Sequence, residues 1–320
     1  MVPPVRAVRV RVPATSANLG PGFDCAGLAL SCWDVLDVAV TDGGLTVEVA
    51  GAGDGDLPTD ETHLVVQAFR AACAELGWTP AGLHLSARNG IPQGRGLGSS
   101  AAAVTAGVLA AWALCPDVPA VDDAAVLRLC SALEGHPDNV AACLLGGATL
   151  SWTTPTGARA ARLSVAPRIA PVLFVPDATL STSVARGLLP AVVPHADAAH
   201  AAGRAALLVH ALTRDPALLF EATEDRLHQT QRAAAMPESA ALLGALRAEG
   251  HAAVVSGAGP TVLVLSPLED DEHLGDPASA ARVRAVRDRT PPGWRCLPLQ
   301  VDAVGAMVRP STDDHDAVSF

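Results

Sequence analysis

The segment at residues 91–104, IPQGRGLGSSAAAV, constrains this chain more than any other part of it. Three glycines stand at alternate positions, and two serines and a run of alanines follow them. Glycine lets the backbone turn sharply and lets a ligand approach the main chain, and the alanine run favours a helix. A glycine-rich loop that enters a helix N-terminus favours an anion, because free N–H groups and the helix dipole point there. The alternative is an ordinary turn before a buried helix.

The composition narrows the classes of protein that carry such a loop. The chain has no lysine, which a Walker A phosphate loop requires, so any phosphate site is of another kind. Of its 320 residues 50% are hydrophobic and 17% are charged, which indicates a globular protein of one or two domains. The net charge of −11 argues against a nucleic-acid partner. The start of the chain, MVPPVRAVRV, lacks the apolar core of a signal peptide, and no apolar run approaches the length of a membrane span. We therefore expect a cytoplasmic protein without a membrane partner.

Strand and helix patterns occur in both halves of the chain, which predicts an α+β fold. Asp42-Gly43-Gly44 predicts a hairpin turn between the strands at 28–40 and 45–49. The stretch 216–232 predicts one longer helix. Residues 154–161 have no apolar period, and we place the domain boundary near them. The expected division is an N-terminal ATP-binding domain at 1–158, a C-terminal domain at 159–310 and a polar tail at 311–320.

Two further stretches add to the glycine-rich segment. PATSANLGPGFD spans residues 13–24, and SGAGPT at 256–261 precedes an apolar run. In this order the three stretches resemble the GHMP kinase superfamily of small-molecule kinases. Within it, PATSANLGPGFD together with EGHPDNV at 134–140 looks like the homoserine kinases. The resemblance implies a two-domain fold, with a ribosomal-protein-S5-like N-terminal domain and a ferredoxin-like C-terminal domain, and an active site between them.

The resemblance implies phosphorylation of the L-homoserine hydroxyl by ATP with Mg²⁺, giving O-phospho-L-homoserine for threonine biosynthesis. His63 stands where the family often has an Asn near the adenine, and it is assigned to the nucleotide on that ground. The rest of the expected ATP site is the glycine-rich segment itself. Its members are Pro92, Gln93, Gly94, Arg95, Gly96, Leu97, Gly98, Ser99, Ser100, Ala101 and Ala102.

A hydroxyl at the helix start and a nearby carboxylate are suitable ligands for Mg²⁺, which prefers hard oxygen atoms. The spacing does not decide between Ser99 and Ser100, and the resemblance favours Ser100. Glu134 is the carboxylate candidate, since it precedes Gly135 and would point into a turn. A simple helix cap for the serine and an exposed helix end for Glu134 are the structural alternatives.

Homoserine is a zwitterion, so its site needs groups for an ammonium, a carboxylate and the reacting hydroxyl. Arginine binds a carboxylate with two parallel hydrogen bonds, and the resemblance points to Arg186 and Arg232. Asp24 could take the ammonium or lie near the hydroxyl. Asp24, Glu134 and Thr182 are the candidate catalytic residues, and no general base is assigned. The remaining candidates for substrate binding are Asn18, His136, Asp138 and Asn139.

Two other functions compete with this one. Another small-molecule GHMP kinase, of the mevalonate or sugar type, would share the loop but not the amino-acid-like acceptor residues. A non-catalytic ligand-binding protein of the same fold would not need Ser100, Glu134 and Asp24. By analogy, the ferredoxin-like half suggests a homodimer.

Overall fold

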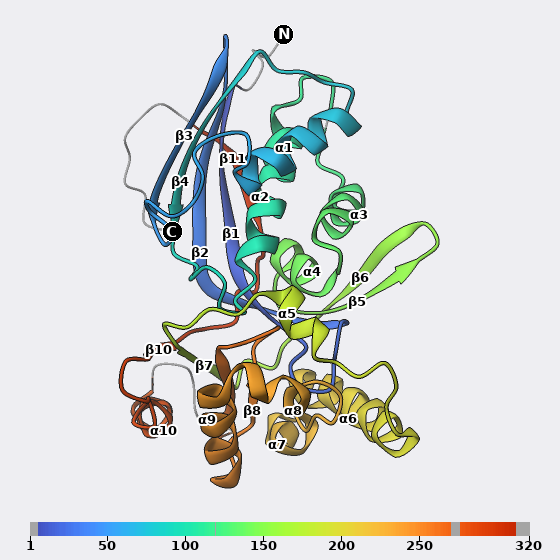
Figure 1. Cartoon of the computed structure of the whole chain (residues 1–320), viewed down its shortest axis with the longest axis vertical. Helices are drawn as coiled ribbons and strands as arrows, with labels where there is room; N and C mark the ends of the chain where they lie inside the picture. Colours follow the sequence, from blue (N-terminus) through green and yellow to red (C-terminus); the bar gives the residue numbers. More distant parts are fainter. Residues whose placement is uncertain (1–5, 119, 270–275, 312–320) are drawn as a thin grey trace.

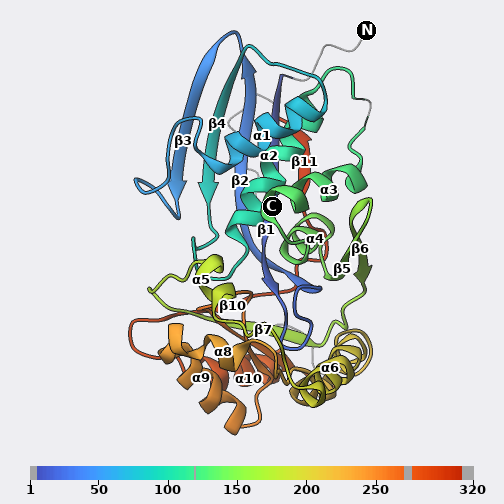
Figure 2. The same ribbon diagram turned by 45° about the vertical axis from the view of Figure 1, so that its right-hand side comes forward.

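The computed structural model describes residues 6–118, 120–269 and 276–311, which form two sheets with helices packed on them (Figure 1). In both views the two sheets lie one above the other along the long axis of the molecule (Figure 2). In the described part of the chain, no helix combines the length and the apolar character needed to cross a membrane.

The first sheet has seven strands in the order β11-β1-β2-β4-β3, and β5 joins β2 and carries β6 at its free edge. The alternation of valine and arginine at the start of β1 predicts a strand, and the structure confirms it. Val8, Val10 and Val12 are buried, whereas Arg9 and Arg11 face away from the core. The strands are β1 (Ala7–Ala17), β2 (Ala26–Thr41), β3 (Gly44–Gly51), β4 (Gly82–Asn89), β5 (Ala148–Thr154), β6 (Gly157–Leu163) and β11 (Met307–Pro310).

Four helices cover one face of this sheet (Figure 1). They are α1 (Leu64–Glu75), α2 (Ser99–Leu114), α3 (Asp123–Glu134) and α4 (Asp138–Leu145). The alanine-rich α2 is buried along most of its length, because small side chains let its neighbours approach closely. Gly107 is required for this approach, since a Cβ there would overlap the carbonyl oxygen of Val65 on α1.

The second sheet has the βαββαβ plan of the ferredoxin-like expectation, in the antiparallel order β10-β7-β9-β8. Its strands are β7 (Ile169–Val175), β8 (Ala253–Val255), β9 (Val262–Pro267) and β10 (Arg295–Pro298). All seven residues of β7 are buried, so it forms the centre of this half. The helices are α5 (Thr182–Gly187), α6 (His195–Thr213), η1 (Pro216–Leu218), α7 (Leu219–Ala222), α8 (Gln229–Arg232), η2 (Ala233–Ala235), α9 (Pro237–Ala248) and α10 (Pro277–Arg287).

The predicted hairpin between β2 and β3 is wrong. The two strands follow each other in the chain, but β4 lies between them, antiparallel to β2 and parallel to β3. β4 can begin directly against the Asp42-Gly43-Gly44 turn because its first residue, Gly82, has no side chain. A Cβ on Gly82 would overlap the side chain of Thr41 and the backbone of Gly43.

The single helix predicted over 216–232 is also wrong, because the chain leaves the helical path between α7 and α8. The buried carboxylate of Asp225 accepts hydrogen bonds from the backbone N–H groups of Leu227, His228 and Gln229. Aspartate competes with the helix for its own backbone in this way. The break directs α8 toward the space between the two sheets.

The predicted domain boundary at 158/159 falls inside β6, which pairs with β5 from Ala148↔Leu163 to Thr154↔Gly157. We propose that the division follows Leu163, so that the whole hairpin stays with the first sheet. The chain also returns to that sheet near its end, where β11 pairs with β1. Of the expected polar tail at 311–320, residues 312–320 lie outside the described residues.

Candidate active site

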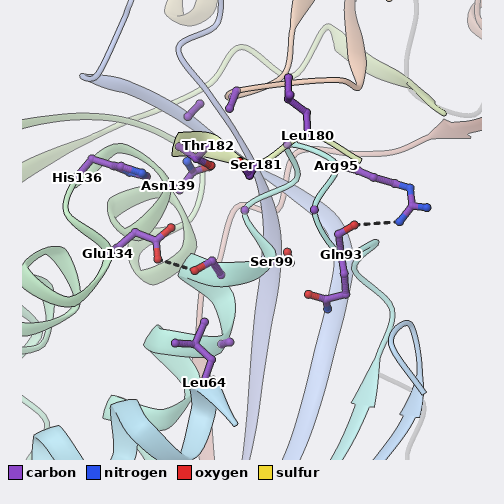
Figure 3. A pocket seen from close by; sticks show the side chains of 18 of the residues that line it. Leu64, Gln93, Arg95, Ser99, Glu134, His136, Asn139, Leu180, Ser181 and Thr182 are labelled. Carbon is purple, nitrogen blue, oxygen red and sulfur yellow. Dashed lines mark hydrogen bonds between the residues drawn. The ribbon is translucent and has the colours of Figure 1, made fainter. Parts of the chain in front are cut away.

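A cavity of about 410 Å³ lies between the two sheets, and the predicted site residues surround it (Figure 3). The predicted residues that line it are Asn18, Asp24, His63, Gln93, Gly94, Arg95, Gly96, Gly98, Ser99, Ser100, Glu134, His136, Asp138, Asn139, Thr182, Arg186 and Arg232. Pro92, Leu97, Ala101 and Ala102 are buried behind this wall and do not line the cavity. Segments separated by more than 200 residues therefore share one space.

The glycine-rich loop runs along one wall, and all three of its alternate glycines have left-handed backbone conformations. The φ angles are 65° at Gly94, 74° at Gly96 and 68° at Gly98. Two of them are also required by the protein's own packing. A Cβ at Gly96 would overlap the carbonyl oxygen of Ser256, and one at Gly98 would overlap the hydroxyl of Thr15. The loop therefore has its shape without a ligand, with Gly98 as the N-cap of α2.

The second domain holds this loop in place through the carbonyl groups of Pro176 and Asp177 and the hydroxyl of Ser256. The Arg95 guanidinium donates hydrogen bonds to the carbonyl oxygens of Gln93, Pro176 and Asp177 at 2.7–2.9 Å. Figure 3 shows the one to Gln93. The Ser256 hydroxyl donates to the carbonyl oxygen of Gly96 at 2.6 Å. The SGAGPT motif is thus a support for the loop, and the charge of Arg95 is used on the protein's own backbone.

Ser100 and Glu134 meet where the loop enters α2. The Ser100 hydroxyl donates a hydrogen bond to Glu134 Oε2 at 2.7 Å, and Figure 3 shows the Glu134 carboxylate pointing toward the start of α2. Glu134 is the last residue of α3, which Gly135 ends with a φ of 86°. Burial raises the pKa of Glu134, and the Ser100 hydrogen bond opposes this shift.

This pair fits the hard oxygen ligands that Mg²⁺ prefers, and a cation would compensate the partly buried carboxylate. Within the described residues no cluster of three or more His, Cys, Asp or Glu side chains could hold a metal ion. A two-ligand protein site is typical of Mg²⁺, which takes its other ligands from phosphate and water.

Beside the loop lies a polar cluster in which most side chains are already paired. Asn18 donates a hydrogen bond from Nδ2 to the carbonyl oxygen of Gly257 at 2.8 Å, and its Oδ1 accepts from the Asp24 N–H at 3.0 Å. His136 Nδ1 lies 2.9 Å from Asp138 Oδ1, and this contact raises the pKa of His136. Asn139 accepts a hydrogen bond from the Thr15 hydroxyl at 2.8 Å, which gives it a structural role as well.

The two predicted arginines differ in their surroundings. Arg186 binds Asp24 with two hydrogen bonds, of 2.7 and 3.1 Å, and each side chain of this pair is more than a third exposed. Arg232 is 1% exposed, and its hydrogen bonds to described residues leave from Nε and Nη1, to Ala185 O, His228 Nδ1 and Gly257 O. Thr182, the first residue of α5, lies one helical turn before Arg186.

Both guanidinium groups stand over the ring of Phe23, at 5.9 Å for Arg186 and 5.5 Å for Arg232. Desolvation is the main cause that lowers the pKa of Arg232, and the positive charge of Arg186 lowers it further. Two cations that line one cavity favour an anion between them. In this structure Asp24 supplies the negative charge.

Sequence reasoning missed His228 and Phe23, whose rings lie 5.1 Å apart. His228 is completely buried between the carbonyl oxygen of Gly20, 2.9 Å from Nε2, and Arg232. Burial lowers its pKa, so a neutral ring that donates from Nε2 and accepts at Nδ1 fits both contacts. Its position one turn before Arg232 in DRLHQTQR was the available signal.

His63, predicted for the nucleotide, is 4% exposed at the start of α1. Among the described residues, neither of its ring nitrogens has a hydrogen-bond partner. Burial lowers its pKa, which favours the neutral ring. Buried polar groups ordinarily have a hydrogen-bond partner, so an unpartnered ring on a cavity wall indicates a place for a ligand.

Comparison with known proteins agrees with this geometry. Residues 63–147 match the family model of the GHMP kinases N terminal domain, and residues 204–285 match that of the GHMP kinases C terminal. A homoserine kinase of Streptomyces avermitilis is 55% identical over 305 residues, covering 95% of this chain and 96% of its own. One from Clavibacter michiganensis is 50% identical, covering 95% and 94%.

Solved structures share the fold. The homoserine kinase of Cytophaga hutchinsonii superposes with a TM-score of 0.80 at 26% identity, over 95% of this chain and 98% of its own. A mevalonate kinase of L. major, at 15% identity and a TM-score of 0.67 over 94% and 99%, is similar in fold alone. The chain therefore belongs to the GHMP kinases and, within them, to the homoserine kinases.

Proposed function

We propose that this chain transfers the γ-phosphoryl group of ATP to the side-chain hydroxyl of L-homoserine, giving ADP and O-phospho-L-homoserine. The observation that carries the choice of acceptor is the pair Arg186 and Arg232, which converge with Asp24 on one cavity. Two guanidinium groups beside a carboxylate match a zwitterion and do not match a sugar. The curated relatives named homoserine kinase support the same choice.

The phosphate side of the cavity suits a triphosphate. Backbone N–H groups of the loop from Gly94 to Ser100 and the N-terminus of α2 attract an anion. Ser100 and Glu134 would hold Mg²⁺, which supplies neutralisation of the charge on the β- and γ-phosphates. His63 lies at the start of α1, where the base would bind, and offers its two ring nitrogens.

The acceptor side would bind homoserine by exchanging partners. The substrate carboxylate takes the place of Asp24 on Arg186, and the released Asp24 carboxylate accepts from the substrate ammonium. Arg232, held by His228 and Gly257, adds the second positive charge. Thr182, His136, Asp138 and Asn18 then surround the hydroxyl. A loose phosphoryl-transfer transition state needs positioning more than a strong base, so these residues orient the attacking oxygen.

This activity would place the chain in threonine biosynthesis. A cytoplasmic location and a homodimer formed through the ferredoxin-like half stay predictions. Sedimentation of the purified chain at several concentrations tests the second of them.

A substrate panel tests the proposed function. The purified chain is incubated with MgATP and L-homoserine, mevalonate or galactose, and release of ADP is measured together with the phosphorylated product. We expect turnover with L-homoserine and none above background with the other two. Equal or greater turnover with mevalonate would refute the assignment, and ADP release without a phosphorylated acceptor would reveal an ATPase.

A further inference from the structure

Asp34 is a carboxylate on the wall of the cavity that the proposed mechanism does not use. It lies on β2, is 4% exposed, and lines the cavity together with Leu36 of the same strand and Asn89 of β4. Its Oδ1 accepts a hydrogen bond from the backbone N–H of Ile91 at 2.9 Å. The backbone N–H of Gly90 also stabilises its ionised form. Among the described residues, main-chain N–H groups hold this buried carboxylate.

Gly90 and Ile91 connect the sheet to the phosphate loop. β4 ends at Asn89, and the loop glycines begin at Gly94. Gly90 fits closely here, since a Cβ would lie 2.6 Å from the carbonyl oxygen of Trp33. The later part of the loop is fixed by the hydrogen bonds of Arg95 to Pro176 and of Ser256 to Gly96, and neither of them involves β2. Asp34 holds the start of the loop, through the backbone N–H of Ile91.

We propose that Asp34 is a positioning residue for ATP, whose ionised carboxylate holds the start of the phosphate loop against β2 and thereby sets nucleotide affinity. The inference rests on the proposed use of ATP. Hydrogen bonds to a charged acceptor are shorter and about twice as strong as neutral ones. Protonation of Asp34 would therefore loosen the loop where it leaves the sheet.

Burial raises the pKa of Asp34 to about 6, against the opposing effect of the Ile91 and Gly90 N–H groups. Its titratable neighbours are the thiols of Cys32 on β2 and Cys143 on α4, and burial raises the pKa of both. His63 lines the same cavity from α1. With raised pKa values the thiols are neutral near pH 7, so neither adds a negative charge beside the carboxylate.

A raised pKa in the folded state means that the protonated form is the one that folding favours. The stability that this group contributes is present at low pH and is lost as the pH rises from its ordinary value of 3.8 through about 6. At neutral pH the fold thus retains a buried charge that folding disfavours. Such groups are more common at functional sites than elsewhere.

The test compares ATP binding to the wild type and to Asp34→Asn by calorimetry, without homoserine, at pH 8 and pH 5. At pH 8 we expect the dissociation constant of the variant to be about fivefold higher or more, because a neutral amide replaces a charged acceptor. At pH 5 the two constants should converge, since Asp34 is then protonated in the wild type. The terminal phosphate of ATP titrates in the same range, but it does so for both proteins.

Three measurements separate this role from a structural one. The thermal midpoint of Asp34→Asn at pH 8 should be no lower than that of the wild type. Asp37→Asn removes the same charge from the same strand, where Asp37 pairs with Arg9 at 2.7 Å, and should leave ATP affinity unchanged. Should Asp34→Asn fail to fold, exchange of the Ile91 amide hydrogen in the wild type, corrected for intrinsic rate, should still show lower protection at pH 5.

Unchanged ATP affinity in Asp34→Asn at pH 8, or an affinity ratio that does not depend on pH, would overturn the proposal. An equal loss in Asp37→Asn would do the same. The experiment uses ATP alone, so a chain that bound ATP in this way but phosphorylated another acceptor would refute only the proposed function.

Discussion

The two sides of the cavity recognise their ligands by different means. The phosphate side is one contiguous stretch, Gly94 to Ser100, whose positive φ angles and packed glycines present main-chain N–H groups. The acceptor side gathers side chains from four separate segments, and Asp24 and Arg186 pair with each other, as do His136 and Asp138. The first is preformed by backbone geometry. The acceptor side consists of ion pairs, and a zwitterionic substrate can bind there by taking the place of one member of a pair.

Glu134 lies where the two sides meet, and its substitution should have the largest effect. Glu134→Gln keeps the size and the hydrogen bond with Ser100 but offers Mg²⁺ a neutral ligand. We expect turnover to fall on the order of 100-fold, as for the loss of one charge-stabilising group, and the Mg²⁺ concentration for half-maximal rate to rise. Steady-state rates across a Mg²⁺ titration measure both. An unchanged titration would leave Glu134 as a helix-terminal residue without a metal role.

Arg186 tests the exchange of partners on the acceptor side. Arg186→Ala should raise the KM for homoserine by roughly 30-fold, about 2 kcal/mol, the low end for loss of a charge partner because the pair with Asp24 is partly exposed. Arg186→Lys keeps the charge but not the planar fork, and it should already be impaired. ATP affinity without homoserine should not change.

A homoserine ester provides the control, since it lacks the carboxylate charge. The ester should be far less sensitive to Arg186→Ala than the free acid is. An equal loss for ester and acid would mean that Arg186 shapes the site by holding Asp24, and Arg232 would become the candidate for the carboxylate.

Gly98 tests whether the phosphate side is preformed by packing. Because a Cβ there overlaps the Thr15 hydroxyl and φ is 68°, Gly98→Ala should destabilise the protein by about 1–3 kcal/mol. Thr15→Ala removes the overlapping hydroxyl, so the double variant should be more stable than the sum of the single changes predicts. Urea unfolding of the four proteins gives this coupling. Strict additivity would mean that the positive φ, and not the Thr15 hydroxyl, accounts for the cost of alanine at this position.

The contrast between the two sides also explains what the sequence could predict. The loop and the SGAGPT motif are local, and their glycines indicate the backbone shape directly, so their place in the cavity was predictable. The pairing of Asp24 with Arg186 joins residues 162 positions apart, and no local pattern contains it. Asp34 occupies one of the buried positions of β2, whereas an aspartate in a strand ordinarily faces solvent.

The same limit applies to the fold. The turn at Asp42-Gly43-Gly44 was located correctly, but which strand lies beside β2 depends on Gly82, 39 residues away. The break before α8 depends on a single carboxylate, that of Asp225, turning back on its own backbone. A period of apolar residues does not reveal that competition.

The smallest effects are expected at His63, the nucleotide residue whose ring has no partner among the described residues. His63→Phe keeps a flat ring without hydrogen-bonding groups, and should raise the dissociation constant for ATP about fivefold, the value of one hydrogen bond. His63→Asn restores an amide and should recover most of the affinity. His210→Asn, on the exposed end of α6, is the matched control and should leave ATP binding unchanged.

The pH dependence of the stability of these variants tests the burial of the His63 ring independently of ATP binding. Burial lowers the pKa of His63, so the unfolded chain takes up a proton near pH 6.5 where the folded chain does not. The stability that this group contributes is present above pH 6.5 and is lost as the pH falls below it. The wild type should therefore lose more unfolding free energy between pH 7.5 and pH 5.5 than His63→Asn does, measured by urea titration. If both lose the same amount while ATP affinity still falls in His63→Phe, the ring contacts the nucleotide from a position that water already reaches.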